Sequence, residues 1–532
     1  IRDRYAAHPQ VTALDTLLKN DTSRNIFLKG LNGSGPAMTI ASLFTKGRGS
    51  YVCVLNDQEE AGYFYHDLMQ LTASNEVYFF PSAYRRAIKY GHVDPANEIL
   101  RTEVLSRLQD PDASFVIVTY PDALAERVVA REVLKENTLK ISVGEKLDNM
   151  FVSDVLDEYG FEQVDYVYEP GQYALRGSIL DVFSFSNEFP YRIDFFGDEV
   201  ETIRTFDVET QLSKEKLDSI YIVPEMSKNA MDSTSLLGSL PRNTCIAARD
   251  LAWCKERIGS VWNDDPVVAD EESFADIDQM RKKLVRGEDF LREVLDFRRI
   301  HFGARPMGTA DATIHFSTQT QPIYHKNFDR VSESFHKYLD EGYTLYILSD
   351  QEKQANRIRM IFEDRGDNIP FTAVNRTIHE GFTDDTLRIC FFTDHQLFDR
   401  FHKFNLKSDK ARSGKITLSL KELNQFSQGD YIVHIDHGVG QFGGLVRTEV
   451  NGKMQEAIKL IYQNNDIIFV SIHSLHKLSK YKGKESGEPP KLSKLGTGAW
   501  EKMKERTKAK VKDIARDLIL LYSKRKQETG FA

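Results

Sequence analysis

A strand, a glycine-rich turn and a helix in immediate succession constrain this chain more than any other feature. Residues Asn25–Lys29 form a short apolar run that predicts a buried strand. A turn with three glycines follows, and a second apolar run then opens a helix. This is the frame of the phosphate-binding loop, G-x-x-x-x-G-K-[ST], with Gly30 and Gly35 at its two glycine positions. Pro36 replaces the lysine that reaches the β- and γ-phosphates, and Ala37 replaces the hydroxyl that holds Mg²⁺.

Two interpretations of this loop remain open from the residues alone. Pro36 removes a backbone N–H that would face phosphate, so one interpretation is a nucleotide-binding fold that no longer binds nucleotide. The other is an ordinary strand–loop–helix turn that never bound phosphate, because glycine-rich turns are common.

Length and composition indicate several globular domains. The chain has 532 residues, of which 41% are hydrophobic and 28% charged. Its four cysteines are scattered without a C-x-x-C pair, which suits a reducing cytosol. Apolar runs such as 115–118 are too short to cross a bilayer. The chain begins at Ile1 without a signal-peptide pattern, and the missing methionine indicates a shortened chain.

Charge is unevenly distributed along the chain. The net charge is −9, but residues 473–526 hold 16 Lys+Arg and 6 Asp+Glu, which leaves the rest strongly acidic. A basic C-terminal segment indicates either a polyanionic partner or a solvated, charge-rich linker and helix, and both readings stay open.

Alternating strand-like and amphipathic stretches over residues 1–137 predict βαβ units and a parallel sheet. From about 140 the pattern changes to strands and hairpins. Residues 173–183 read as one strand, 191–196 as the next, and 199–203 as its hairpin partner after the Gly197-Asp198 turn.

The second half of the chain shows two further patterns. Residues 223–310 look mostly helical, with a helix expected over 290–302, and 311–415 look like a second α/β domain without a phosphate loop. Its expected elements are a strand at 344–348, a helix at 351–365 and a strand at 388–392. Residues 427–478 read as a small all-β module with a hairpin turn at Asn451-Gly452 and a strand at 467–470. A charged linker at 482–490 and an amphipathic helix over 497–525 follow.

No catalytic or metal-binding constellation is expected. The chain has no G-x-S-x-G, no H-E-x-x-H and no intact phosphate loop. On a strand, His434 and Asp436 would share a face while His437 points away, which favours a structural role beside the glycine turn over a metal site. The acidic pair Asp384-Asp385 is interpreted as loop charge.

Arg176, Arg192 and Phe196 form a different kind of group. Arginine with an exposed aromatic residue on a strand face has the composition of an interface hot spot. The alternative is that Phe196 packs under a neighbouring helix while the arginines are solvated.

Two longer segments carry a family resemblance. Residues 169–183 followed by 192–201 resemble the UvrA-binding domain shared by UvrB and the bacterial transcription-repair-coupling factors, the Mfd family. Residues 429–440 resemble the CarD-like, RNA polymerase-interacting domain of that family, which UvrB lacks. On this basis the chain is identified as the N-terminal half of such a factor.

The resemblance implies a multidomain α/β architecture. A degenerate P-loop-type module at 1–137 and 223–310 would be interrupted by the UvrA-binding α+β domain at 138–222. A non-catalytic α/β domain at 311–415, a small Tudor- or SH3-like β-barrel at 425–482 and a basic linker helix at 491–532, toward a translocase motor, would follow.

The resemblance also implies partners and sites. Arg176, Arg192 and Phe196 match the UvrA-contacting residues, and Ile458, on the strand after the hairpin turn, is expected to contact the polymerase β subunit. No cofactor is expected in this chain, because ATP and Mg²⁺ would serve the motor. Double-stranded DNA would be a partner of the whole protein, no membrane is implied, and the location would be cytoplasmic. Two alternatives remain: a UvrB-type helicase fragment with unorthodox ATP binding, and a free-standing CarD-like transcription regulator.

Overall fold

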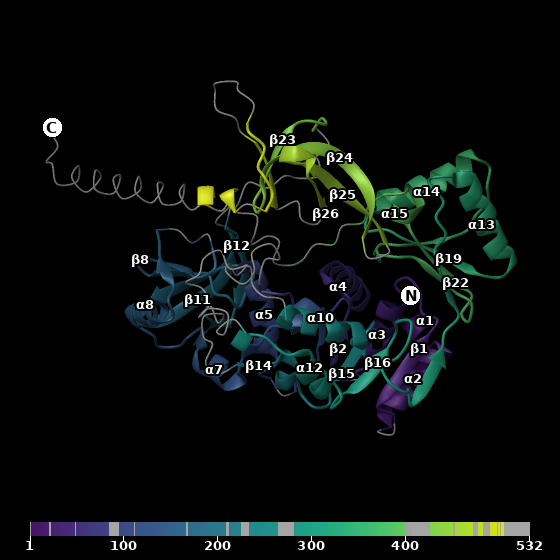
Figure 1. The fold of residues 1–532 in the computed structure, drawn as a ribbon. Coiled ribbons are helices and arrows are strands. Elements are labelled where there is room, and N and C mark those ends of the chain that lie inside the picture. The colour runs from purple at the N-terminus through teal and green to yellow at the C-terminus, as the bar shows by residue number, and fades with distance from the viewer. Residues whose placement is uncertain are drawn as a thin grey trace. The chain divides into compact units, whose positions relative to one another are not determined.

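Strands from distant parts of the sequence meet in one parallel sheet (Figure 1). The computed structural model describes residues 2–504 apart from 21–22, 48, 84–94, 111, 166, 168, 209–211, 225–232, 264–280, 401, 403, 405, 407–425, 451–452, 472–476, 482–489, 497 and 501. The described chain divides into two compact units, 1–414 and 415–532. It is a mixed α/β protein with several sheets, as the sequence predicts at that level. Among its described helices, none has the length and apolar character needed to span a bilayer.

The first sheet has seven strands in the order β17-β1-β16-β15-β2-β4-β3, all paired in parallel. Three of them come after the expected UvrA-binding segment, so that segment interrupts a single α/β module. The strands are β1 (Asn25–Lys29), β2 (Tyr51–Val54), β3 (Val77–Phe79), β4 (Val116–Thr119), β15 (Cys245–Ala248), β16 (Arg298–His301) and β17 (Ala312–His315).

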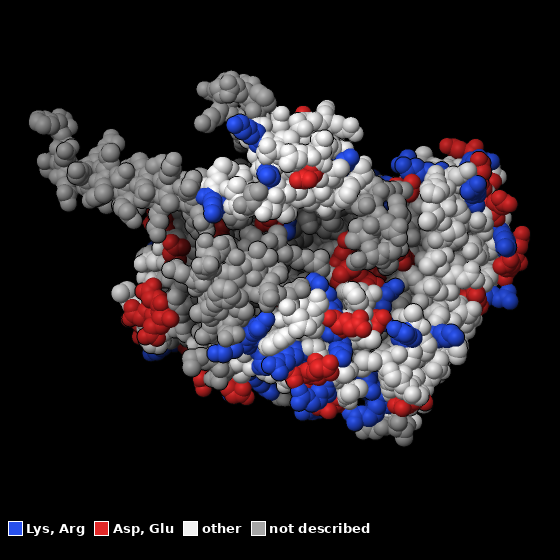
Figure 2. All heavy atoms as spheres, in the orientation of Figure 1, with Lys and Arg blue, Asp and Glu red and all other residues white. Residues whose placement is uncertain are grey.

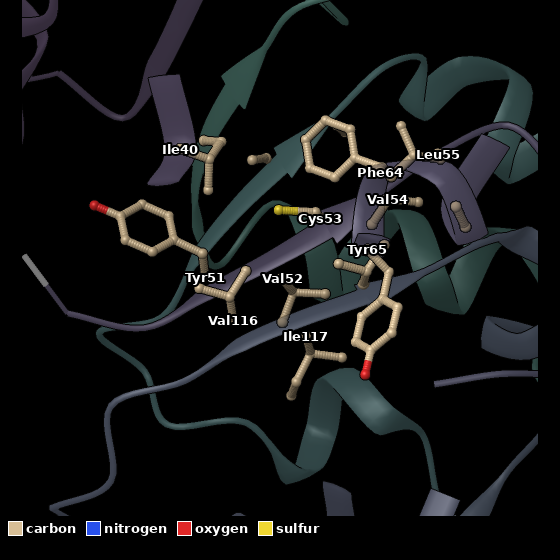
Figure 3. Close-up of a cluster of buried hydrophobic side chains, with 14 of the residues drawn as sticks. Ile40, Tyr51, Val52, Cys53, Val54, Leu55, Phe64, Tyr65, Val116 and Ile117 are labelled. Atoms are coloured by element: carbon tan, nitrogen blue, oxygen red, sulfur yellow. The ribbon is translucent and has the colours of Figure 1, made fainter. Parts of the chain in front are cut away.

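Helices enclose this sheet, and its strands β2 and β4 are buried along their whole length. Every residue of β2 is buried, as expected for a parallel strand covered on both faces. Figure 3 shows Val52 and Cys53 of β2 among Ile40, Phe64 and Ile117. The helices of this module are α1 (Arg2–Ala6), α2 (Pro9–Lys19), α3 (Gly35–Thr45), α4 (Gln58–Thr72), α5 (Pro95–Arg107), α6 (Pro121–Leu124), α7 (Arg131–Glu136), α9 (Leu236–Ser239), α10 (Leu251–Asn263) and α12 (Gly287–Val294), with a small pair of strands, β5 (Val128–Val129) and β14 (Ser233–Thr234).

The helix predicted over 290–302 is wrong in its second half. Helix α12 ends at Val294, and residues Arg298–His301 form β16 between β1 and β15. The central place of β16 in the sheet, where Ile300 is fully buried, overrides the local preference for helix.

The interrupting segment forms a six-stranded sheet in the order β12-β11-β10-β9-β8-β7, with helix α8 (Asn149–Glu158) on one face. The single strand predicted over 173–183 is wrong: it is a hairpin that turns at Gly177, whose φ of 64° suits glycine. The strands are β7 (Glu162–Gln163), β8 (Gln172–Arg176), β9 (Ile179–Val182), β10 (Tyr191–Phe196), β11 (Glu199–Phe206) and β12 (Ser213–Leu217), and β6 (Leu139–Ser142) pairs separately with β13 (Ser219–Ile222).

Residues 318–397 form the second α/β domain, and its three predicted elements are confirmed to within a residue. Its sheet order is β18-β21-β22-β19-β20. Its core is partly its own, but Ile378, Phe382 and Phe391 belong to the same apolar cluster as Ile40 of α3. The elements are β18 (Thr318–Thr320), α13 (Phe328–Asp340), β19 (Thr344–Leu348), α14 (Glu352–Asp364), β20 (Thr372–Val374), β21 (Phe382–Asp384), β22 (Ile389–Thr393) and α15 (Asp394–Leu397).

The C-terminal unit holds a five-stranded antiparallel sheet in the order β26-β25-β24-β23-β27. The predicted hairpin is confirmed by pairing as far as Val450 with Lys453, while its turn residues and most of the predicted 497–525 helix lie outside the described residues. The elements are β23 (Tyr431–His434), β24 (Gly438–Val450), β25 (Lys453–Ile461), the 3₁₀ turn η4 (Gln463–Asn465), β26 (Ile467–Ser471) and β27 (Leu478–Lys480).

Candidate interaction sites

The glycine-rich loop lies where the sequence predicts, between β1 and α3. Gly30 and Gly33 have φ values of 86° and 54°, which L residues rarely adopt. Gly35 starts α3, and Pro36 occupies its first turn, where a missing N–H breaks no helical hydrogen bond. Pro36 and Ala37 are both buried, so neither side chain faces a ligand.

Two amides of the loop have partners in the second α/β domain. The N–H of Ser34 donates to the carbonyl of Glu380 at 3.1 Å. The N–H of Asn32 donates to the hydroxyl of Thr318 at 2.8 Å, and that hydroxyl donates to the carbonyl of Gly30 at 2.8 Å. The loop therefore binds polypeptide.

The side chains of Ser34 and Asp67 complete this contact. The Ser34 hydroxyl donates to Asp67 at 2.5 Å and accepts the N–H of Glu380 at 3.0 Å, while Asp67 also accepts the N–H of His379 at 2.7 Å. Asp67 is buried, and this burial raises the pKa of its carboxyl. The sequence analysis missed Asp67 because a single aspartate within an amphipathic helix gives no signal.

The predicted arginines of the six-stranded sheet meet on one buried carboxylate. Asp181 of β9 is 1% exposed and accepts from Arg176 at 2.5 Å and from Arg192 at 2.7 and 2.8 Å. The Arg192 guanidinium also lies 4.3 Å from the ring centre of Phe206, and its hydrogen bonds to Asp181 raise its pKa. The sequence analysis did not identify Asp181. A carboxylate in an apolar strand, across the sheet from two arginines, is the signal that could have found it.

Phe196 lies at the end of β10 and is 78% exposed. Its neighbour Phe195 is 4% exposed, because successive residues of a strand face opposite sides of the sheet. The alternative that Phe196 packs under a helix is wrong. Asp194, which shares the face of Phe196, is paired with Arg204 at 2.9 Å and with the hydroxyl of Thr202 at 2.8 Å. This face thus carries one exposed aromatic ring, that of Phe196, together with charged side chains that are fixed by ion pairs and hydrogen bonds.

Ile458 does not lie on the surface. Its side chain is 0% exposed, and its strand is flanked by β24 and β26 at that position. Ile458 is therefore a core residue, which contradicts the predicted direct contact with the polymerase. Across the hairpin, a bulge at Gly443-Gly444 separates the part of β24 that pairs with β23 from residues 445–450, which pair with β25 alone among the described residues. Leu445, at the start of that half, is 44% exposed.

The glycine turn after β23 anchors a segment that follows the sheet. A Cβ at Gly438 would lie 2.2 Å from the Ser493 hydroxyl, which accepts the N–H of Val439 at 2.9 Å. The indole of Trp500 donates to the carbonyl of Ile435 at 3.0 Å. His434 accepts the N–H of Asp436 through its ring at 3.0 Å, a structural contact of the kind expected. The described residues contain no group of three His, Cys, Asp or Glu side chains placed to hold a metal.

The surface over α10 and α12 gathers basic side chains, as Figure 2 shows. Acidic residues are interleaved with them: Arg257 pairs with Asp122 at 2.6 Å and Lys255 with Glu288 at 2.7 Å. This mixed face is not the uniform basic footprint of a nucleic-acid site. The basic segment 473–526 lies mostly outside the described residues, so DNA binding there stays a prediction.

Comparison with known proteins gives two domain matches. Residues 139–227 match the UvrB interaction domain, and residues 426–482 match the CarD-like/TRCF RID domain. The chain is 25% identical over 584 residues to the transcription-repair-coupling factor of Bacillus subtilis (strain 168), a match that covers 95% of this chain and 49% of the relative. It is 24% identical over 607 residues to the same factor of Staphylococcus aureus (strain USA300), covering 98% and 51%. The chain thus spans about half the length of these curated relatives, and the family resemblance seen in its motifs is confirmed.

Proposed function

We propose that this chain, similar over nearly its whole length to transcription-repair-coupling factors, is the adaptor part of such a factor. It would bind RNA polymerase stalled at a DNA lesion and recruit UvrA for nucleotide excision repair in the cytoplasm. The observation that carries the proposal is the presence of both matched domains in one chain, one of which presents an exposed phenylalanine beside fixed arginines. ATP and Mg²⁺ are assigned to a translocase motor outside these residues.

We assign UvrA binding to the outer face of β10, centred on Phe196. An exposed aromatic side chain is a common interface anchor, and Asp181 holds Arg176 and Arg192 in place before the partner arrives. Arg192 is largely covered, so Arg176 and Phe196 supply most of the direct contact.

Calorimetric titration of UvrA into the full chain tests this assignment. Phe196→Ala should weaken binding by about 2 kcal/mol, roughly thirtyfold. Met360→Ala is the matched control, because Met360 is also strongly exposed but lies on α14 in another domain. Equal affinities for the Phe196→Ala and Met360→Ala variants would remove Phe196 from the site.

We assign polymerase binding to the part of β24 beyond its bulge, where β25 is its one strand partner among the described residues. A partner strand could add there through backbone hydrogen bonds, with side chains near Leu445 giving specificity. This replaces Ile458 as the contact and keeps the same hairpin.

Pull-down of RNA polymerase distinguishes binding at β24 from binding at β26, on the other side of β25. Leu445→Arg should lose binding by at least about tenfold, because a charge enters an apolar contact at the pairing edge. Ile467→Arg, at a residue of almost equal exposure on β26, should bind normally. The reverse pattern would move the contact to β26, and binding by both variants would exclude both edges.

The helicase alternative requires nucleotide binding at the loop. The contacts of Ser34 and Asn32 with the second α/β domain weigh against it, since they use the amides that phosphate would need. The free-standing regulator is disfavoured by the similarity to coupling factors over 95% of the chain.

A further inference from the structure

The degenerate loop has glycines without the phosphate chemistry, and the structure gives Gly30 and Gly33 a steric reason. A Cβ on Gly30 would lie 2.2 Å from the carbonyl oxygen of Phe316, and one on Gly33 would lie 2.9 Å from that of Gly381. Real Cβ atoms do not approach backbone oxygens so closely. Gly30 therefore admits the residue that follows β17, its neighbour in the first sheet, whereas Gly33 admits backbone of the second α/β domain where a working loop admits phosphate.

The polar contacts that Ser34 and Asp67 make with the second α/β domain involve peptide groups only. Ser34 and Asp67 together bind both N–H groups of His379 and Glu380 and the carbonyl of Glu380. Each donor and acceptor in this set is matched, as buried polar groups require. None of these hydrogen bonds involves a side chain of residues 379–380.

Helix α4 extends the contact with apolar and aromatic packing. The ring of Tyr63 stacks on that of His379 with centroids 3.5 Å apart, and the Tyr63 hydroxyl donates to the carbonyl of His402 at 3.0 Å. Gly62 leaves room for the ring of Phe404, which a Cβ would meet at 2.2 Å. The loop and α4 thus form one continuous docking surface.

We propose that the relic phosphate loop is an intramolecular peptide-binding site, and that residues 379–381 occupy it in place of phosphate. This assigns a role to the second α/β domain: it fills the former nucleotide site and fixes itself to the first module. Loss of the lysine and hydroxyl is then only part of the reason that nucleotide is excluded. The loop amides themselves are engaged by the chain.

Hydrogen exchange of the full chain, followed by mass spectrometry, tests this proposal with a matched glycine pair. Gly30 and Gly49 share a φ of 86°, but a Cβ at Gly49 meets nothing within 4 Å. Alanine at either position would take the same left-handed φ, so their difference reports the contact of Gly30 with Phe316, which leads directly into Thr318, the partner of the Asn32 amide in the loop. Gly30→Ala should speed exchange at residues 30–37 and 377–382 together by at least about tenfold, and Gly49→Ala should leave both segments protected.

A second variant covers the case in which Gly30→Ala does not fold. Asp67→Asn keeps the shape of the side chain but removes one acceptor, so exchange at His379 and Glu380 should also rise. Unchanged exchange at 377–382 in Asp67→Asn would overturn the proposal. Protection of the wild-type loop on adding millimolar Mg–ATP would overturn it as well, because phosphate would then compete with Glu380 for the loop.

Discussion

Two recognition surfaces of this chain differ in what covers them. The glycine loop keeps the shape of a ligand site, yet its amides and glycines receive backbone from the same chain. The outer face of β10 has no inherited ligand motif, yet it holds two arginines on Asp181 and leaves Phe196 exposed. One surface is covered by the protein's own chain, while the other exposes an aromatic ring to solvent.

The difference teaches that a motif and a site are separate things. At the loop, the close backbone approach at Gly30 and Gly33 requires glycine whether or not phosphate binds. At β10, the proposed binding depends on which face of the strand each side chain occupies, and residue spacing alone does not predict that. Substitutions at the filled surface should therefore change stability, whereas substitutions at the open surface should change binding.

The sharpest contrast is between two adjacent phenylalanines of β10. Phe195→Ala should lower the free energy of unfolding by about 3–5 kcal/mol, because it removes a ring from a packed core. Phe196→Ala should change it by less than about 0.5 kcal/mol, because that ring is exposed. Urea titrations of the two variants measure both values. A large loss with Phe196→Ala would mean that the exposed ring has a structural role.

Substitution of Asp181 tests whether its buried carboxylate fixes Arg176 and Arg192 in place. Asp181→Ala should lower the free energy of unfolding by roughly 3 kcal/mol, since it leaves two guanidinium groups without their shared acceptor. The guanidinium of Arg192 is mostly covered, so water replaces this acceptor poorly. UvrA affinity should also fall if the arginines contribute to binding. Asp198→Ala, in the exposed turn after β10, is the control and should be neutral. A neutral Asp181→Ala would show that the arginines find other partners.

Much of the fold could be predicted because its signals are local. The strand 344–348 is where the sequence predicts it, since apolar runs flanked by polar turns mark buried parallel strands. The failures have long-range causes. Residues 298–301 are a strand only because β1 and β15 lie on either side, and these come from positions far earlier in the chain.

The candidate sites show the same division. The face of Phe196 could be predicted from strand alternation, but its exposure could not, and Asp67 gave no signal because its partners meet it only in the folded chain. Ile458 shows the converse: alternation correctly places it on a strand but does not tell which face is covered.

Acid should weaken the filled surface through His395. The ring N–H of His395 in α15 donates to the backbone carbonyl of His379, in the docked segment, at 2.9 Å. Burial, with the nearby charges of Arg400 and His66, lowers its pKa to about 4 from 6.5. The unfolded chain therefore binds a proton that the folded chain does not between pH 6.5 and 4. Stability falls as the pH falls through this window, by up to about 3 kcal/mol from this residue.

The variant His395→Gln isolates that contribution. An amide can still donate to the His379 carbonyl but does not titrate, so thermal unfolding of this variant should depend less on pH between 6.5 and 4. The comparison with wild type is needed because other groups also titrate. Burial raises the pKa values of Asp67 and Asp394 nearby, which favours the folded state in acid. Burial also lowers the pKa of His301, in the first sheet, as it does that of His395. Identical pH profiles for wild type and variant would show that His395 is not the group responsible.

The smallest expected effect concerns the charges beside Phe196. Arg204→Ala breaks the 2.9 Å pair with Asp194, but both side chains are partly solvated and Asp194 keeps the hydroxyl of Thr202. We expect a loss of stability below about 1 kcal/mol, further reduced by salt. The same change uncovers the carboxylate of Asp194 on the face that carries Phe196. If UvrA meets that carboxylate with positive charge, its affinity should rise at low salt and return to the wild-type value at high salt. If UvrA does not reach past Phe196, affinity should stay constant at both salt concentrations, which would set the boundary of the open surface between Phe196 and Asp194.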